Sequence, residues 1–262
     1  MTHQPRKRFG QNFLHDTGVI RRIVDSIHPR PGEHLVEIGP GKGALTRPLL
    51  QACGRLDVVE LDRDLVLPLQ QQLADAGELR VHQADALRFD FCALADAGQR
   101  LRVVGNLPYN ISTPLLFHLM EQSRCIEDMH FMLQKEVVQR MVAKPGSKDY
   151  GRLTVMLAWY CEAEMLFTVG PGAFFPAPKV ESAIVRLRPH ARPPVALRDP
   201  ARFSRLVAQA FAQRRKTLRN NLKGWLTAEA ISALGIDPGI RAERLSLEQF
   251  ARLSNALPEC EP

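Results

Sequence analysis

Hydrophobic residues in the first two thirds of the chain alternate between helical spacing and short continuous runs. The first helical face consists of Ile20, Ile23, Val24 and Ile27, and either Asp16 or Thr17 is suited to cap that helix. Two further helical faces are Leu45, Leu49 and Leu50, and then Leu65, Leu69 and Leu73. Short apolar runs predict strands at Leu35–Ile38, Leu56–Leu61, Leu79–Gln83 and Leu101–Gly105. This alternation predicts an α/β fold in which helices cover both faces of a parallel sheet.

The pattern continues to about residue 188 and then changes. A strand is predicted at Met129–Leu133 and a helix at Lys135–Val142, and the runs Ala163–Val169 and Val180–Leu187 suggest an antiparallel pair at one sheet edge. The segment Pro189–Pro200 holds four prolines, which is typical of a linker. Only helical patterns follow it: Phe203–Ala212, Thr217–Trp225, Ala228–Leu234 and Leu247–Leu257. We therefore expect an α/β domain over residues 1–188 and a small helical domain over residues 189–262.

Composition adds information about partners. Hydrophobic residues make up 45% of the chain and charged residues 24%, which is ordinary for a globular protein. The formal net charge of +7 favours a polyanionic partner, although solubility alone is a competing explanation.

The five cysteines are scattered and never form a Cys-x-x-Cys pair, and the eight histidines show no ligand spacing. We expect free thiols in a reducing compartment, with neither a disulfide framework nor a metal site. The first eight residues are polar and basic, and no run of about 18 apolar residues occurs anywhere. These features predict a cytoplasmic protein without membrane association, and we expect a monomer.

A glycine-rich segment, Gly39-Pro40-Gly41-Lys42-Gly43, joins the first predicted strand to the next helix. Glycines at this position let the backbone approach a nucleotide-like ligand, and the spacing resembles the dinucleotide fingerprint. Glu37 stands just before the loop, where it would repel a pyrophosphate but tolerate the sulfonium and ammonium groups of S-adenosylmethionine. A phosphate-binding P-loop is excluded, because no Gly-Lys-Ser/Thr follows.

The next two predicted strands also end in acids, Glu60 and Asp85. Ligands of open α/β sheets bind at the carboxyl ends of the strands. Glu60 is suited to accept hydrogen bonds from both ribose hydroxyls, and Asp85 from an adenine amine. Either acid alone has a simpler explanation as a solvated surface group, but three acids at successive strand ends predict a site for S-adenosylmethionine.

The fourth strand runs into Asn106-Leu107-Pro108-Tyr109, which by itself is compatible with an ordinary proline turn. At the same sheet edge as the acids, the Asn106 side-chain oxygen and the Leu107 carbonyl could orient a planar amine while Tyr109 stacks on its ring. Alignment would then supply most of the catalysis, with no strong general base. Phe174 is the candidate to cover the other face of an extruded base, and core packing is its alternative.

Long motifs across nearly the whole chain resemble the ribosomal RNA adenine N6-dimethyltransferases. They are Arg6–Leu14, Glu37–Thr46, Asn106–Tyr109, Phe174–Ser182 and Gln213–Leu222. The resemblance implies a Rossmann-like class I methyltransferase sheet and is strongest to the bacterial small-subunit branch. That branch implies dimethylation of two adjacent adenosines in a hairpin loop near the 3′ end of 16S rRNA, in a partly assembled 30S particle. The family's cofactor contacts map onto Asn12, Leu14, Gly39, Glu60, Asp85 and Asn106, beside which we place Glu37 and Gly41.

Basic residues cluster in the motifs on either side of the α/β core, and we expect them to contact RNA phosphates: Arg6, Lys7, Arg8, Arg214, Arg215, Lys216, Arg219 and Lys223. Three alternatives stay open. One is a dinucleotide-dependent oxidoreductase, which Glu37 disfavours. The second is a 23S rRNA dimethyltransferase of the same family, and the third is a non-enzymatic factor that binds immature 30S particles.

Overall fold

The computed structural model describes residues 12–96 and 98–258. It divides into two compact units. One consists of the described residues up to Val138 together with Glu164–Pro189, and the other of Gln139–Ala163 with the described residues from His190 onward. The units thus do not correspond to a single cut after residue 188, because a segment from the middle of the chain folds with the C-terminal helices. The division into functional domains stays a prediction.

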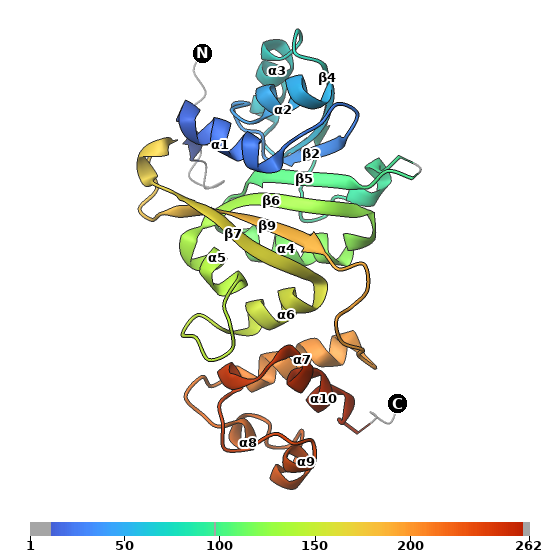
Figure 1. Ribbon diagram of the computed structural model, residues 1–262. Helices are drawn as coiled ribbons and strands as arrows, with labels where there is room; N and C mark the ends of the chain where they lie inside the picture. The colour runs from blue at the N-terminus through green and yellow to red at the C-terminus, as the bar shows by residue number, and fades with distance from the viewer. Residues whose placement is uncertain (1–11, 97, 259–262) are drawn as a thin grey trace. The chain divides into compact units, whose positions relative to one another are not determined.

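The first unit is built on a seven-stranded sheet with the order β4-β3-β2-β5-β6-β9-β7, shown in Figure 1. Strands β4, β3, β2, β5 and β6 are parallel to their neighbours, whereas β9 is antiparallel to β6 and separates it from the edge strand β7. Every predicted strand is confirmed, as is the predicted adjacency of the last two. The bounds are β2 His34–Ile38, β3 Arg55–Glu60, β4 Glu78–Gln83, β5 Leu101–Asn106, β6 Ile126–Gln134, β7 Cys161–Val169 and β9 Ser182–Pro189.

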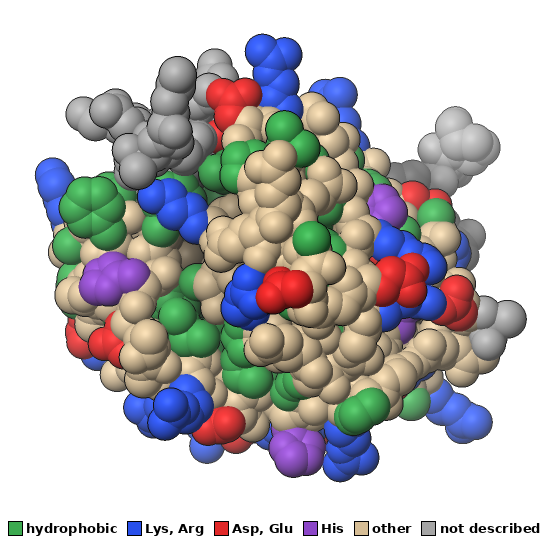
Figure 2. Space-filling view, turned by 90° about the horizontal axis from the view of Figure 1, so that it is seen from above, with side chains coloured by type: hydrophobic (Ala, Val, Ile, Leu, Met, Phe, Trp, Pro, Cys, Tyr) green, Lys and Arg blue, Asp and Glu red, His purple; other side chains and the backbone are tan. Residues whose placement is uncertain are grey.

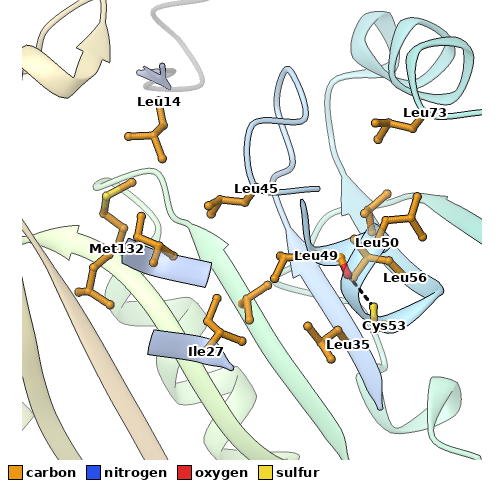
Figure 3. Close-up of a cluster of buried hydrophobic side chains, with 14 of the residues drawn as sticks. Leu14, Ile27, Leu35, Leu45, Leu49, Leu50, Cys53, Leu56, Leu73 and Met132 are labelled. Carbon is orange, nitrogen blue, oxygen red and sulfur yellow. Dashed lines mark hydrogen bonds between the residues drawn. The ribbon is translucent and has the colours of Figure 1, made fainter. Parts of the chain in front are cut away.

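Helices α1 (Thr17–Ile27), α2 (Thr46–Cys53) and α3 (Arg63–Gln72) contribute leucines and isoleucines to one hydrophobic cluster against the sheet. Of the two candidate caps of α1, Asp16 is the one that accepts a hydrogen bond from the Val19 N–H, at 2.9 Å, and Gly54 is the C-cap of α2. Figure 3 shows the buried side chains of α2 lying beside those of β2 and β3.

Several elements were not predicted, among them a two-stranded ribbon, the helix over Ser112–Glu121 and, in the second unit, the helix over Arg152–Tyr160. Helix α4 (Ser112–Glu121) lies on the opposite side of the sheet from α1 and begins directly after the Asn106–Tyr109 segment. A two-stranded antiparallel ribbon pairs β1 (Phe13–Leu14) with β8 (Phe174–Phe175) across 160 residues of sequence, and the short 3-10 helix η4 (Pro171–Ala173) precedes β8. Helix α5 covers Lys135–Met141, as expected.

The second unit is helical in its described part. Helices α6 (Arg152–Tyr160), α7 (Pro200–Ala210) and α10 (Leu247–Asn255) pack together, and Phe203 and Phe250 are among its fully buried side chains. Shorter elements complete it: α8 Leu218–Asn221, α9 Ala228–Ala233 and η5 Ala242–Arg244. No helix among the described residues of either unit is long and apolar enough to cross a membrane.

The prediction that the cysteines are all free thiols is wrong, because Cys92 and Cys125 form a disulfide. Two short 3-10 helices, η2 (Phe91–Leu94) and η3 (Ser123–Cys125), bring them together. The side-chain oxygen of Gln122 accepts hydrogen bonds from the backbone N–H groups of Phe91 and Cys92, at 2.7 and 3.2 Å, and so holds η2 against η3.

The remaining cysteines differ. Cys53 and Cys161 are buried free thiols, and Cys260 lies outside the described residues. Among the described residues, no three His, Cys, Asp or Glu side chains are grouped as metal ligands.

Gly105 allows β5 to pair closely with β2, because it has no side chain. A Cβ added at Gly105 would lie 2.6 Å from the Ile38 carbonyl oxygen, a backbone atom that cannot move independently. We expect Gly105→Ala to lower the free energy of unfolding by about 1–3 kcal/mol, because the strands must separate. Urea unfolding checks this, with Gly172→Ala as the control, since a Cβ there meets nothing within 4 Å. Equal changes in the two variants would contradict the prediction.

Candidate active site

The carboxyl ends of β2, β3, β4 and β5 surround a pocket of about 360 Å³. Parallel pairing brings these ends to one edge of the sheet, and the chain continues from each into a loop that lines the pocket. Eight of its lining residues are those predicted to bind a cofactor: Asn12, Leu14, Glu37, Gly39, Gly41, Glu60, Asp85 and Asn106. Residues distant in sequence thus meet at one site.

The glycine-rich loop has the backbone conformation that only glycine adopts readily. Gly39, Gly41 and Gly43 all have positive φ angles, of 66°, 56° and 81°. At Gly41 an added Cβ would come within 3.2 Å of the Phe13 ring, so there is little room for a side chain between Gly41 and this ring. The loop therefore presents bare backbone to the pocket, which leaves room for a ligand.

Glu37 is a buried acid whose Oε2 atom has no hydrogen-bond partner among the described residues. Burial raises the pKa of the Glu37 carboxyl to about 8. The Thr46 hydroxyl opposes this rise, and the negative charge of Glu60 adds to it. A carboxyl held in this way favours a positively charged group, because a cation would restore its ionised form.

Glu60 is also buried, but both of its oxygens are engaged. Oε1 accepts a hydrogen bond from the Asp62 N–H at 2.7 Å and Oε2 one from the Gly41 N–H at 3.3 Å. Burial raises the pKa of this carboxyl as well. These two bonds fix its orientation and tie β3 to the glycine loop, while each oxygen keeps a lone pair for a ligand.

Asp85 follows β4, and its Oδ1 accepts a hydrogen bond from the Leu87 N–H at 3.0 Å. The segment after it is fastened to the C-terminal end of α4. His118 and Gln122 both bond the Phe89 carbonyl, at 2.8 and 3.1 Å. The loop carrying Asp85 is therefore positioned by the same helix that follows the Asn106–Tyr109 segment.

The Asn106 amide lies at the pocket in a defined orientation. Its Nδ2 donates a hydrogen bond to the Asn12 carbonyl at 3.1 Å, which sets the direction of the side-chain oxygen. Leu107 is buried and donates its N–H to the Met132 carbonyl at 3.2 Å, and the Tyr109 hydroxyl bonds Ser182 Oγ at 2.8 Å. All three residues line the pocket, and their role in holding a base stays a prediction.

Phe174 does not line the pocket. Its side chain is 3% exposed and packs in the hydrophobic cluster with Leu14, its partner across the β1–β8 ribbon. Its neighbour Phe175 is 65% exposed. The stacking role of Phe174 stays a prediction.

Several pocket residues were missed by sequence reasoning. Leu61 and Ala86 follow Glu60 and Asp85 directly, and they add an apolar surface next to each acid. Phe13 and Lys42 also line the pocket, with the Lys42 ammonium 4.7 Å from the centre of the Phe13 ring. For Leu61 and Ala86, position in the sequence was the available signal, since each directly follows a strand-end acid that lines the same pocket.

Comparison with known proteins decides the family. Residues 2–259 match the family described as "Ribosomal RNA adenine dimethylase". The chain belongs to this family. It is therefore an enzyme that methylates adenine in ribosomal RNA, and the oxidoreductase alternative is excluded.

Relatives of this dimethylase are similar along almost their full length. The chain is 59% identical to "Ribosomal RNA small subunit methyltransferase A" of Pseudomonas aeruginosa, over 98% of this chain and 96% of that protein. It is 60% identical to the protein of the same name from Methylococcus capsulatus, covering 98% and 99%.

Solved structures agree on the fold. A dimethyladenosine transferase from Plasmodium falciparum matches with a TM-score of 0.79 at 24% identity, covering 92% of this chain and 95% of that one. The 23S rRNA methyltransferase ErmE matches with a TM-score of 0.72 at 29% identity, covering 94% and 99%. The Rossmann-like methyltransferase sheet with an antiparallel edge is thus confirmed.

The basic residues predicted to contact RNA are only partly described. Arg6, Lys7 and Arg8 lie outside the described residues. In the second unit of the dimethylase, five exposed basic residues lie on or beside α8: Arg214, Arg215, Lys216, Arg219 and Lys223.

Buried Asn221 holds the loop that carries three of these residues. Its Nδ2 donates hydrogen bonds to the carbonyls of Ala210 and Gln213, at 2.7 and 3.1 Å. Arg214 is itself paired with Glu243 at 3.2 Å, which leaves less of its charge available to a polyanion.

The raised pKa of Glu37 predicts how the stability of the unliganded dimethylase depends on pH. Between about pH 4.5 and 8 the carboxyl is ionised when the chain is unfolded but protonated when it is folded. The free energy of unfolding should therefore fall as pH rises through this interval, by on the order of 4 kcal/mol. Urea unfolding at several pH values measures it.

Glu37→Gln should remove most of this pH dependence and be more stable than the wild type at pH 8. Glu121→Gln, at an exposed acid of α4, is the control and should keep the wild-type profile. A free energy of unfolding of the wild type that does not change between pH 5 and 8 would contradict the raised pKa of the buried Glu37 carboxyl.

Proposed function

We propose that the protein uses S-adenosylmethionine to dimethylate the N6 amines of two adjacent adenosines in a hairpin loop near the 3′ end of 16S rRNA. The substrate in this proposal is the 30S particle during small-subunit maturation, and the protein acts as a monomer in the cytoplasm. The relatives from Pseudomonas aeruginosa and Methylococcus capsulatus are named small-subunit methyltransferases, which supports the choice of 16S over 23S rRNA. The convergence of Glu37, Glu60, Asp85 and Asn106 on one pocket carries the proposal.

The residues of the pocket fit S-adenosylmethionine. This cofactor supplies a methyl group on a positively charged sulfonium ion. The carboxyl of Glu37, with its unpartnered buried oxygen, is suited to such a cationic ligand. Glu60 would hold the ribose hydroxyls and Asp85 the adenine amine, while Leu61 and Ala86 offer apolar surface to the adenine ring. Asn12, Leu14, Gly39 and Gly41 complete the cradle.

The target amine needs orientation more than activation. The lone pair of an adenine N6 amine is delocalised into the ring, so acceptors that bond both N–H groups favour a pyramidal nitrogen. Asn106 Oδ1, oriented by the bond from its amide to Asn12, and the Leu107 carbonyl are the two acceptors. Tyr109, anchored through its hydroxyl to Ser182, stacks on the base, and in-line alignment supplies most of the rate.

The covering of the other base face and the RNA contacts belong to the same proposal. Phe174 would have to be uncovered from the core before its ring could stack on a base. The helical domain from residue 189 onward would bind rRNA through its basic residues, together with Arg6, Lys7 and Arg8. Figure 2 shows, on the face it presents, Lys and Arg side chains interspersed with acids rather than one continuous basic surface.

Replacement of Asn106 tests the catalytic assignment. We expect Asn106→Ala to lower the rate of methyl transfer to 30S particles by about 100-fold or more, because the amine loses its orienting acceptor. Calorimetry should show cofactor affinity reduced only a few-fold. Gln71→Ala, at an exposed position of α3, is the control. Near-normal turnover in Asn106→Ala would remove this residue from its role, and methylated adenines mapped to 23S rather than 16S rRNA would overturn the proposed substrate.

The salt dependence of particle binding tests the RNA contacts. Each phosphate contact contributes roughly 0.7–0.9 to the slope of log affinity against log salt. The double variant Arg215→Ala/Lys216→Ala should therefore bind 30S particles more weakly and with a slope smaller by about 1.5. Arg63→Ala, at a side chain 82% exposed on the first unit, is the matched control. An unchanged slope would show that the pair does not contact phosphates.

A further inference from the structure

The most exposed large hydrophobic side chain among the described residues is Phe175, at 65%. It is the second residue of β8, and its neighbour Phe174 is buried. Successive side chains of a strand point to opposite faces, so burial of Phe174 forces Phe175 outward. Exposing an aromatic ring to water is unfavourable, so a ring exposed to this degree suggests a binding role.

The pairing of β8 with β1 identifies what lies next to this ring. Phe13 is opposite Phe175, and Leu14 is opposite Phe174. Opposed residues project from the same face of a ribbon, roughly 5 Å apart at Cβ. Leu14 and Phe174 face the hydrophobic cluster, so Phe13 and Phe175 share the other face.

Phe13 connects this face to the pocket. Its ring lines the pocket and packs on the bare Cα of Gly41, and the Lys42 ammonium lies 4.7 Å from the ring centre. The aromatic face of the ribbon thus begins at the pocket and extends outward to Phe175, with a cation beside it.

The loop after Phe175 leads to the other side of the same site. It runs through exposed Lys179 to Ser182, whose hydroxyl bonds the Tyr109 hydroxyl at 2.8 Å. One end of this loop is therefore tied to the pocket through Phe13 and the other through Tyr109. A strand of nucleic acid with one base in the pocket would have its next residues close to this loop.

We propose that Phe175, together with Phe13, forms a stacking platform for an unpaired nucleotide that flanks the target adenosine. The inference rests on the proposed function and adds a specificity-determining residue to it. An aromatic ring accepts any base on its face, and Lys42 and Lys179 offer positive charge to the adjoining phosphates. The platform would fix the strand on one side of the target, so that the extruded base enters the pocket in a single orientation.

Steady-state kinetics on 30S particles, at saturating S-adenosylmethionine, test this platform. Loss of one base-stacking contact should raise KM for the particle by about 5- to 100-fold in Phe175→Ala and leave kcat nearly unchanged. Phe175→Tyr retains the ring and should restore KM. Leu67→Ala, at a side chain 60% exposed on α3, is the matched control and should behave as the wild type. Cofactor affinity measured by calorimetry should be the same in all four proteins.

A KM for Phe175→Ala no higher than that of Leu67→Ala would overturn the inference, as would an equal loss of cofactor affinity. A photoreactive phenylalanine analogue at position 175 gives a second readout, and it should cross-link to rRNA next to the methylated adenosines. Cross-links to ribosomal protein alone would also overturn it. Failure of the wild type to methylate 16S rRNA in these particles would instead refute the proposed function, so the two failures are distinguishable.

Discussion

The structure depends on the parallel pairing of β2 with β3 on one side and β5 on the other. This pairing alone places Glu37, Glu60 and Asn106 at one edge, since each stands at or just before the carboxyl end of its strand. The pairing is tight enough at that edge to require glycine at position 105, opposite Ile38. A site whose groups come from four strands can only be as precise as the sheet that aligns them, and continuous buried strands provide that precision.

Electrostatics at this edge differ from those of the chain as a whole. The protein carries a net charge of +7, yet its pocket holds two buried acids, and the charge of Glu60 opposes ionisation of Glu37. The two buried carboxyl groups differ in their hydrogen-bond partners. Glu60 is satisfied by backbone N–H groups, whereas Glu37 retains an oxygen without a partner in the described part of the chain. Burial of this carboxyl is an energetic cost to the unliganded fold, because the group must be held protonated at neutral pH, and a cationic ligand would offset that cost. A pocket suited to a cationic ligand therefore coexists with a net positive charge on the chain as a whole.

Sequence patterns predicted the strands well, because fully buried parallel strands are continuous apolar runs bounded by glycine and proline. They failed where the same signal is ambiguous. Helices α4 and α6 are so apolar that their sequences show little of the alternation between polar and apolar faces that indicates a helix. Each also follows closely on a motif or loop. The Cys92–Cys125 disulfide was missed for a different reason. Gln122 brings the two single-turn helices that carry these cysteines together. The cysteines are 33 residues apart in sequence, and this spacing does not indicate that contact.

The two adjacent phenylalanines show where sequence reasoning about the site had to stop. A strand of two residues is too short to display a period, so nothing in Phe174-Phe175 indicates which ring is buried. Only the pairing of this strand with Phe13 and Leu14, about 160 residues away in sequence, determines which face each ring occupies. Burial of Leu14 then selects Phe174 for the core and leaves Phe175 at the surface. The choice of the exposed ring is thus made by a contact with the start of the described chain, and residues of that segment also line the pocket.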